Sequence, residues 1–195
     1  MVYSVELIQT AKFNIVQIQN SSQDIKPPGY TLEIKRNDQQ LIVSGEIEIG
    51  ITQALELILK ENPDLSTVIL ESIGGQIYEG RGLSRLFTKH QIDTYSYQEC
   101  SSACATAFIG GKTRHLGQSA KLGFHQYKQD TTKFPKAVPF HNLIEEQNHD
   151  LKIFKSQSIH QQFLDKVFLQ TSDGIWYPTH SELLEAGVIH SVIIN

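Results

Sequence analysis

The sequence TVILESIGG occupies residues 67–75 and joins a compact apolar run to a pair of glycines. Its first five residues, 67–71, are rich in β-branched side chains, which is typical of a strand buried in a parallel sheet. The glycine pair, Gly74 and Gly75, allows a sharp turn and leaves a backbone amide free to point into a cleft. Two glycines also simply end many strands. From these residues alone, an oxyanion-binding loop and a plain turn both stay open.

Predicted strands and helices alternate on both sides of this stretch. Apolar residues recur at helical spacing over 52–61, and Asn62-Pro63 ends that helix. The other predicted helices cover residues 77–89, 101–110, 142–170 and 181–186, and the other predicted strands cover residues 31–34, 40–49, 93–97, 121–125 and 188–193. This order predicts an α/β layer fold with a mostly parallel sheet.

The composition is that of an ordinary globular protein and excludes several classes of function. Of the 195 residues, 39% are hydrophobic and 19% are charged, which is far from the composition of disordered chains. The 17 basic and 21 acidic residues give a net charge of −4 without a basic stripe, so nucleic acid is not expected as a main partner. No apolar run approaches the ~18 residues that a membrane helix needs, and no membrane span is expected.

Two further segments carry residue types that nucleophilic catalysis uses. Residues 100–104, Cys-Ser-Ser-Ala-Cys, follow a predicted strand and open a helix of small residues, which places a serine at the positive end of the helix dipole. His125 ends the later Gly-Phe-His strand, where α/β sheets open their ligand clefts. Taken singly, Ser101 or Ser102 also fits a helix N-cap, and the histidine also fits a structural role.

In combination, these motifs resemble the proteolytic subunit of the Clp protease. Gly-Gly, Ser-Ala and a strand-terminal His occur in the order and approximate spacing of that family, and the resemblance extends over residues 43–193. The chain most resembles the branch of Clp-like putative periplasmic proteins. The features of that branch are a Cys-x-Ser-Ala-Cys core, a Gly-Phe-His strand and a late Trp-Tyr-Pro segment, and they match residues 100–104, 123–125 and 176–178.

The resemblance implies a fold and a set of roles. The fold is a Clp/crotonase-like fold of stacked ββα units, expected as a single domain over residues 1–195. In that domain, residues 41–195 form the core and residues 1–40 form a divergent β-rich segment. The resemblance places the nucleophile at Ser102, the general base at His125, and the oxyanion-hole amides at Gly75 and Ala103.

The third member of a Ser-His-Asp triad is less well placed by the resemblance. Asp173 stands nearly where the family has its acid, just before the terminal helix. Asp165 and Asp130 are alternatives, because the segment around residues 174–177 aligns only with a gap.

The two cysteines of the chain, Cys100 and Cys104, flank the predicted nucleophile. They are close enough to form a disulfide if the chain bends there, and a disulfide would imply an oxidising compartment. Reduced, buried thiols are the equal alternative.

Two other patterns do not predict a cofactor or a metal ion. Residues 110–113, Gly-Gly-Lys-Thr, resemble the end of a phosphate-binding loop, but Thr106 stands where that loop needs a glycine. His141, Glu145 and His149 share a helical face, yet a solvated polar face explains them better than a metal site does. We therefore expect no cofactor and no metal ion.

The residues and the resemblance together predict a serine endopeptidase that hydrolyses peptides or unfolded proteins and forms a homo-oligomer. Residues 128–140 replace the Gly-rich stretch of the family, so ring stacking and an ATPase partner are not predicted. A non-catalytic, crotonase-like binding or scaffold domain is the main alternative, and an acyl-CoA enzyme is the third hypothesis.

The cellular compartment stays open between two predictions. The first fifteen residues carry Glu6 and lack the apolar centre of a secretory signal, which favours the cytoplasm. The resemblance to the periplasmic branch instead favours the cell envelope, if a native leader precedes Met1, the only methionine.

Overall fold

The computed structural model of the chain describes residues 4–10, 13–19, 28–35, 39–127, 142–171 and 173–194, and before residue 28 it describes the backbone alone. The strands are β1 (Ser4–Thr10), β2 (Phe13–Gln19), β3 (Tyr30–Lys35), β4 (Gln40–Gly45), β5 (Thr67–Glu71), β6 (Asp93–Ser96), β7 (Glu99–Ser101), β8 (Arg114–Gly117), β9 (Lys121–Gly123) and β10 (Ser191–Ile193). The helices are α1 (Ile51–Glu61), α2 (Ile77–His90), α3 (Ala103–Ile109), α4 (Leu143–Ser156), α5 (Gln161–Val167) and α6 (His180–Glu185).

One large sheet carries the fold, with the strand order β1-β2-β3-β4-β5-β6-β8-β10. The strands from β1 to β4 pair antiparallel, and those from β4 to β10 pair parallel. The central strand is β5, where Val68 and Leu70 are fully buried as the apolar run predicts. The predicted α/β fold with a mostly parallel sheet is therefore confirmed.

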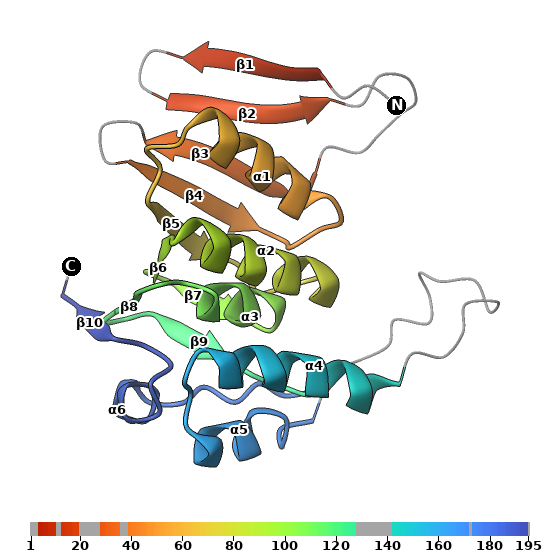
Figure 1. Ribbon diagram of the computed structural model, residues 1–195, viewed down its shortest axis with the longest axis vertical. Coiled ribbons are helices and arrows are strands. Elements are labelled where there is room, and N and C mark those ends of the chain that lie inside the picture. The colour runs from red at the N-terminus through yellow and green to blue at the C-terminus, as the bar shows by residue number, and fades with distance from the viewer. Residues whose placement is uncertain are drawn as a thin grey trace.

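Helices cover one face of this sheet, and α1, α2 and α3 lie side by side on that face in Figure 1. The buried face of α1 is a continuous apolar stripe that includes Leu55 and Ile58. Close packing of α2 on α3 depends on Gly80, because a Cβ atom there would lie 3.1 Å from the Cα atom of Ala103. Among the described residues, none of the helices combines the length and the apolarity that a bilayer-spanning helix requires.

A second, small sheet lies beside the large one. Its core is the parallel pair of β7 and β9. Three isolated bridges widen it: Ile47 with Gly75 and Ser72 with Cys100 are parallel, and Phe124 with Trp176 is antiparallel. The small sheet thus joins segments that are far apart along the chain.

The predicted long helix at residues 142–170 is wrong, because the structure has two helices, α4 and α5, in its place. The chain breaks at Ser158, which adopts a φ of 61°. Ile159 then turns inward to 4% exposure, and the His160 amide donates to the Ala186 carbonyl at 3.0 Å. Burial of Ile159 in the core offsets the interrupted helical hydrogen bonds.

Candidate active site

Ser102 and His125 lie at the same end of the small sheet. Ser102 directly follows β7, and His125 follows β9 after one residue. The register pairs Ser101 with Gly123, and the Ser102 amide donates to the Gly123 carbonyl at 2.8 Å. Since the two strands are parallel, both chains leave the sheet at its carboxyl edge, where α/β folds bind ligands.

The backbone of Ser102 has an unusual conformation, with φ 56° and ψ −124°. A residue other than glycine in such a sparsely populated backbone region costs about 1–3 kcal/mol, and such residues cluster at active sites. Ser102 occupies the N-cap position of α3, yet its side chain makes no capping hydrogen bond. By contrast, the N-cap side chains of Asn142 and Thr179 both accept backbone hydrogen bonds. The hydroxyl of Ser102 is therefore not used to cap the helix.

Its neighbour Ser101 has a different environment. Ser101 is fully buried, and its hydroxyl donates to the carboxylate of Glu99 at 2.7 Å. A serine held in this way is part of the packing of the small sheet. Of the two serines, Ser102 is the one whose surroundings leave its hydroxyl available for chemistry.

The glycine pair lies against Ser102. A Cβ atom at Gly74, which has a φ of 108°, would lie 2.8 Å from the Cβ atom of Ser102. Gly74 and Gln76 make the hydrogen bonds to Ile47, so the Gly75 amide between them faces away from Ile47. Within the described residues, the amides of Gly75 and Ala103 donate to no protein acceptor. Both are therefore available to a ligand oxygen near Ser102.

The His125 ring is held by a backbone carbonyl. Its Nδ1 atom lies 2.6 Å from the Gln126 carbonyl oxygen, which can only accept a hydrogen bond. The neutral ring therefore carries its proton on Nδ1 and has a free lone pair on Nε2. In the described part of the chain this is the one hydrogen bond of His125, and no hydrogen bond joins its ring to the Ser102 side chain.

The three acids proposed from the sequence lie in different places. Asp173 comes shortly before Trp176, which bridges Phe124, and Ile175 packs on β9, since its Cγ2 atom would lie 2.7 Å from a Cβ at Gly123. Asp165 lies on α5, where it accepts a hydrogen bond from Gln161 at 2.8 Å. Asp130 lies outside the described residues. Asp173 stays a prediction for the third member of the triad.

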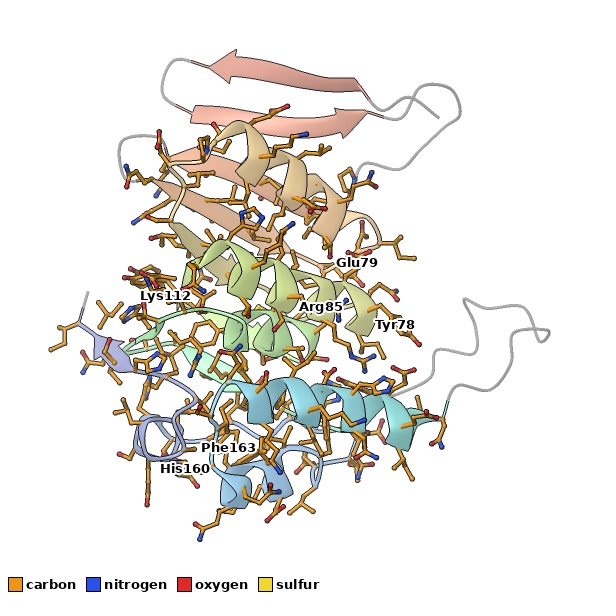
Figure 2. The ribbon with its side chains drawn as sticks, in the orientation of Figure 1. Tyr78, Glu79, Arg85, Lys112, His160 and Phe163 are labelled. Atoms are coloured by element: carbon orange, nitrogen blue, oxygen red, sulfur yellow. A yellow bond between two sulfur atoms is a disulfide. The ribbon has the colours of Figure 1, made fainter. Side chains whose placement is uncertain are left out.

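Two contacts that sequence reasoning missed hold the segment after Asp173, one made by Tyr177 and one by Trp176. The Tyr177 hydroxyl donates to Glu99 at 2.6 Å, and this bond, with that from Ser101, lowers the pKa of the Glu99 carboxyl. Trp176 packs against Phe163, with ring centroids 5.1 Å apart, and Figure 2 shows Phe163 on α5. The one sequence signal for these two contacts was the Trp-Tyr-Pro match at residues 176–178.

Cys100 and Cys104 form a disulfide that closes a small loop around Ser102. Their Cα atoms are 5.2 Å apart, and both residues are fully buried. The bond ties the middle of β7 to the first turn of α3. It therefore restrains the backbone on both sides of the proposed nucleophile.

Removal of this disulfide is expected to lower the free energy of unfolding by about 2 kcal/mol, since a loop of a few residues restricts the unfolded chain only modestly. Urea unfolding of the wild type with and without dithiothreitol measures the effect. The Cys100→Ala/Cys104→Ala variant is the control and should unfold at one urea concentration in both conditions. If the wild type unfolded at the same urea concentration with and without dithiothreitol at equilibrium, the expectation would be contradicted.

Among the described residues, no group of three or more His, Cys, Asp and Glu side chains is arranged to hold a metal ion. Of the three residues weighed as a metal site, His141 lies outside the described residues, and Glu145 and His149 lie on α4.

Comparison with solved structures identifies the fold. ClpP1 from Listeria monocytogenes is similar with a TM-score of 0.63 and 15% identity, over 82% of this chain and 93% of that chain. An asparagine-to-aspartate mutant of the same protein gives a TM-score of 0.64 and 14% identity over the same shares. The chain has a ClpP-like fold. No protein-family model and no curated protein matches the sequence significantly.

Proposed function

We propose that the chain is a serine peptidase in which Ser102 is the nucleophile and His125 is the general base. The observation that carries this proposal is the placement of Ser102. Its strained, uncapped position lies between the glycine loop and the carboxyl end of β9. The ClpP-like fold supports the proposal, because the resemblance of the sequence motifs and the likeness of the fold point to the same family.

The proposed reaction begins with proton transfer from the Ser102 hydroxyl to the Nε2 atom of His125. The Gln126 carbonyl keeps the other ring proton on Nδ1, so Nε2 is ready to accept. The Ser102 oxygen attacks the peptide carbonyl carbon, and the amides of Gly75 and Ala103 stabilise the oxyanion. His125 then gives its proton to the leaving amine, and an ester to Ser102 remains.

Water completes the proposed cycle. His125 takes a proton from the water as it attacks the ester carbonyl, and the Ser102 oxygen leaves with that proton. We propose Asp173 as the acid that stabilises the charged imidazole in both steps. The peptide is thereby split into a carboxylic acid and an amine, and the enzyme is restored.

The wider setting is part of the same proposal. A peptide or an unfolded protein is the proposed substrate, and a homo-oligomer is the proposed assembly. A disulfide persists in oxidising compartments, and the Cys100–Cys104 bond therefore supports the likeness to the Clp-like putative periplasmic branch.

One observation favours the main alternative, a non-catalytic binding domain. Ser102 and His125 are not joined by a hydrogen bond between their side chains in the described structure. Such bonds are often long in free enzymes and tighten only with a substrate bound. A chemical test of Ser102 is therefore needed to choose between the two functions.

The test is reaction of the wild type with a fluorophosphonate probe at pH 7 to 8, followed by peptide mapping. The serine oxygen displaces fluoride from phosphorus, so we expect an adduct at Ser102 and none at Ser101. A well-folded wild type that stays unmodified would instead support the non-catalytic domain. Coenzyme A binding measured by calorimetry would support the acyl-CoA hypothesis.

The Gly74→Ala substitution tests the proposed oxyanion loop. The new methyl group would lie 2.8 Å from both the Ser101 carbonyl oxygen and the Ser102 Cβ atom, so the loop must move. We expect slower probe labelling, because the Gly75 amide moves with the loop, and a loss of about 1–3 kcal/mol in unfolding free energy.

The matched control is Gly50→Ala. Gly50 also has a positive φ, 96°, but a Cβ atom there meets nothing within 4 Å. This variant shares the backbone strain without the collision, so its labelling rate should equal that of the wild type. Equal labelling rates for the two variants would contradict the role of the loop.

A further inference from the structure

The buried carboxylate of Asp150, on α4, binds side chains from three separate segments. Asp150 is fully buried. Thr106 on α3 donates to its Oδ2 atom at 2.8 Å, and the Tyr127 hydroxyl donates to the same atom. The guanidinium of Arg81 on α2 pairs with Oδ1. Both carboxylate oxygens therefore have partners.

These three partners come from the segments that carry the proposed catalytic groups. Arg81 lies on α2, the helix that the Gly75 loop leads into. Thr106 lies one turn after Ser102, and its amide donates to the Ser102 carbonyl at 3.2 Å. Tyr127 lies two residues after His125. Each segment that carries a proposed catalytic group thus contributes one side chain that binds the Asp150 carboxylate.

Ion pairs and hydrogen bonds to charged groups stabilise the cluster of side chains around Asp150. Arg81 pairs also with Glu146, and Tyr78, labelled at the start of α2 in Figure 2, donates to Glu146 at 3.1 Å. Burial alone would lower the pKa of Arg81, but the hydrogen bonds and charge of its carboxylate partners outweigh burial and raise it. Burial and the charge of Asp150 raise the pKa of Tyr127, so its phenol stays protonated and donates.

We propose that Asp150 is a positioning residue, which fixes the distance between Ser102 and His125 by binding Thr106 and Tyr127 at once. The inference rests on the proposed function. The backbones of the two catalytic segments are already joined by the pairing of β7 with β9 and by the bond from Ser102 to Gly123, and the Thr106–Asp150–Tyr127 bridge adds a buried side-chain link between them. Displacement by 1 Å of a group in an active site can cost about 100-fold in rate.

The test compares three conservative variants in probe labelling. Thr106→Val and Tyr127→Phe each remove one donor to Asp150 and keep the shape of the side chain. We expect the limiting labelling rate to fall about 10- to 100-fold, with the half-saturating probe concentration unchanged. Thr106→Ser restores the hydroxyl and should restore most of the rate.

The matched control is Thr94→Val. Thr94 is also fully buried, and its hydroxyl donates to the Phe108 carbonyl at 2.8 Å, at the other end of α3. Thr94 lies on β6, and this variant also loses one buried hydroxyl hydrogen bond that involves α3, so its stability should fall while its labelling rate is kept. Equal loss of labelling in Thr94→Val and Thr106→Val would overturn the proposal.

A second readout does not depend on activity. NMR of a chain labelled with ¹³C at histidine Cε1 reports the position of the His125 ring. Because Thr106 lies on α3 and its side chain is linked to the His125 segment through Asp150 and Tyr127, we expect the His125 signal to shift in Thr106→Val and to stay in place in Thr94→Val. A wild type that the fluorophosphonate probe does not modify would refute the proposed function but not the positioning role. An unmoved His125 signal in Thr106→Val would refute the positioning role, whatever the labelling shows.

Discussion

The Ser102→Ala variant is expected to lose peptide hydrolysis by about 10⁶-fold in kcat, because the nucleophile and its base act as one unit. His125→Ala is expected to lose a similar factor for the same reason. Hydrolysis of a fluorogenic peptide, together with fluorophosphonate labelling, measures both losses. Ser101→Ala is the control. Its hydroxyl is bound to Glu99, so that variant should keep its labelling at Ser102.

The backbone strain at Ser102 provides a second, independent check. Glycine adopts positive φ without steric cost, so Ser102→Gly should have a higher free energy of unfolding than Ser102→Ala, by about 1 kcal/mol. Both variants should be equally inactive. Retained hydrolysis in Ser102→Ala would exclude Ser102 as the nucleophile, and equal stability of the two variants would exclude strain at this position.

Arg81→Met is expected to lower the free energy of unfolding by about 3–5 kcal/mol, because it leaves the buried Asp150 carboxylate without its cation. The side chains of Arg81 and Asp150 are 6% and 1% exposed. For a chain of this size the loss corresponds to a fall in Tm of about 6–20 °C, measurable by scanning calorimetry.

Two further variants separate charge from packing at this site. Arg81→Met/Asp150→Asn removes the unpaired charge while an amide oxygen still accepts from Thr106 or Tyr127, so it should be more stable than Arg81→Met alone. Lys89→Met breaks the exposed Lys89–Glu56 pair, whose side chains are 65% and 54% exposed, and should change Tm little. A double variant as unstable as Arg81→Met would show that the loss comes from packing.

The sequence predicted the strands that are apolar and missed β8, which lies between β6 and β10 in the large sheet. Arg114 and His115 make this segment resemble a charged loop. In the folded chain Arg114 is 3% exposed, and its guanidinium donates to the carbonyls of Gly111, Gly187 and Val188 at 2.8–2.9 Å. These carbonyls come mostly from the other end of the chain, so no local pattern could indicate that the arginine is buried.

The same limit applies to the proposed active site. The motifs predicted roles for Ser102, His125 and Gly75, but from the residues alone a helix N-cap was the favoured interpretation of Ser101 or Ser102. The structure distinguishes them through Glu99, which is held in turn by Tyr177 from a distant segment. Asp150 lies within a polar helix, where a sequence pattern indicates a solvated face.

The small sheet can be completed only late in folding. It joins strands and bridges from Ile47, Ser72, β7, β9 and Trp176, so nearly the whole chain must be in place before its last edge closes. Contacts between such distant segments form late in folding, because long loops must close first. During synthesis, a chain that has not yet emerged as far as Trp176 lacks the residue that bridges Phe124, next to the histidine. The proposed hydrolytic activity would then arise only in the finished fold.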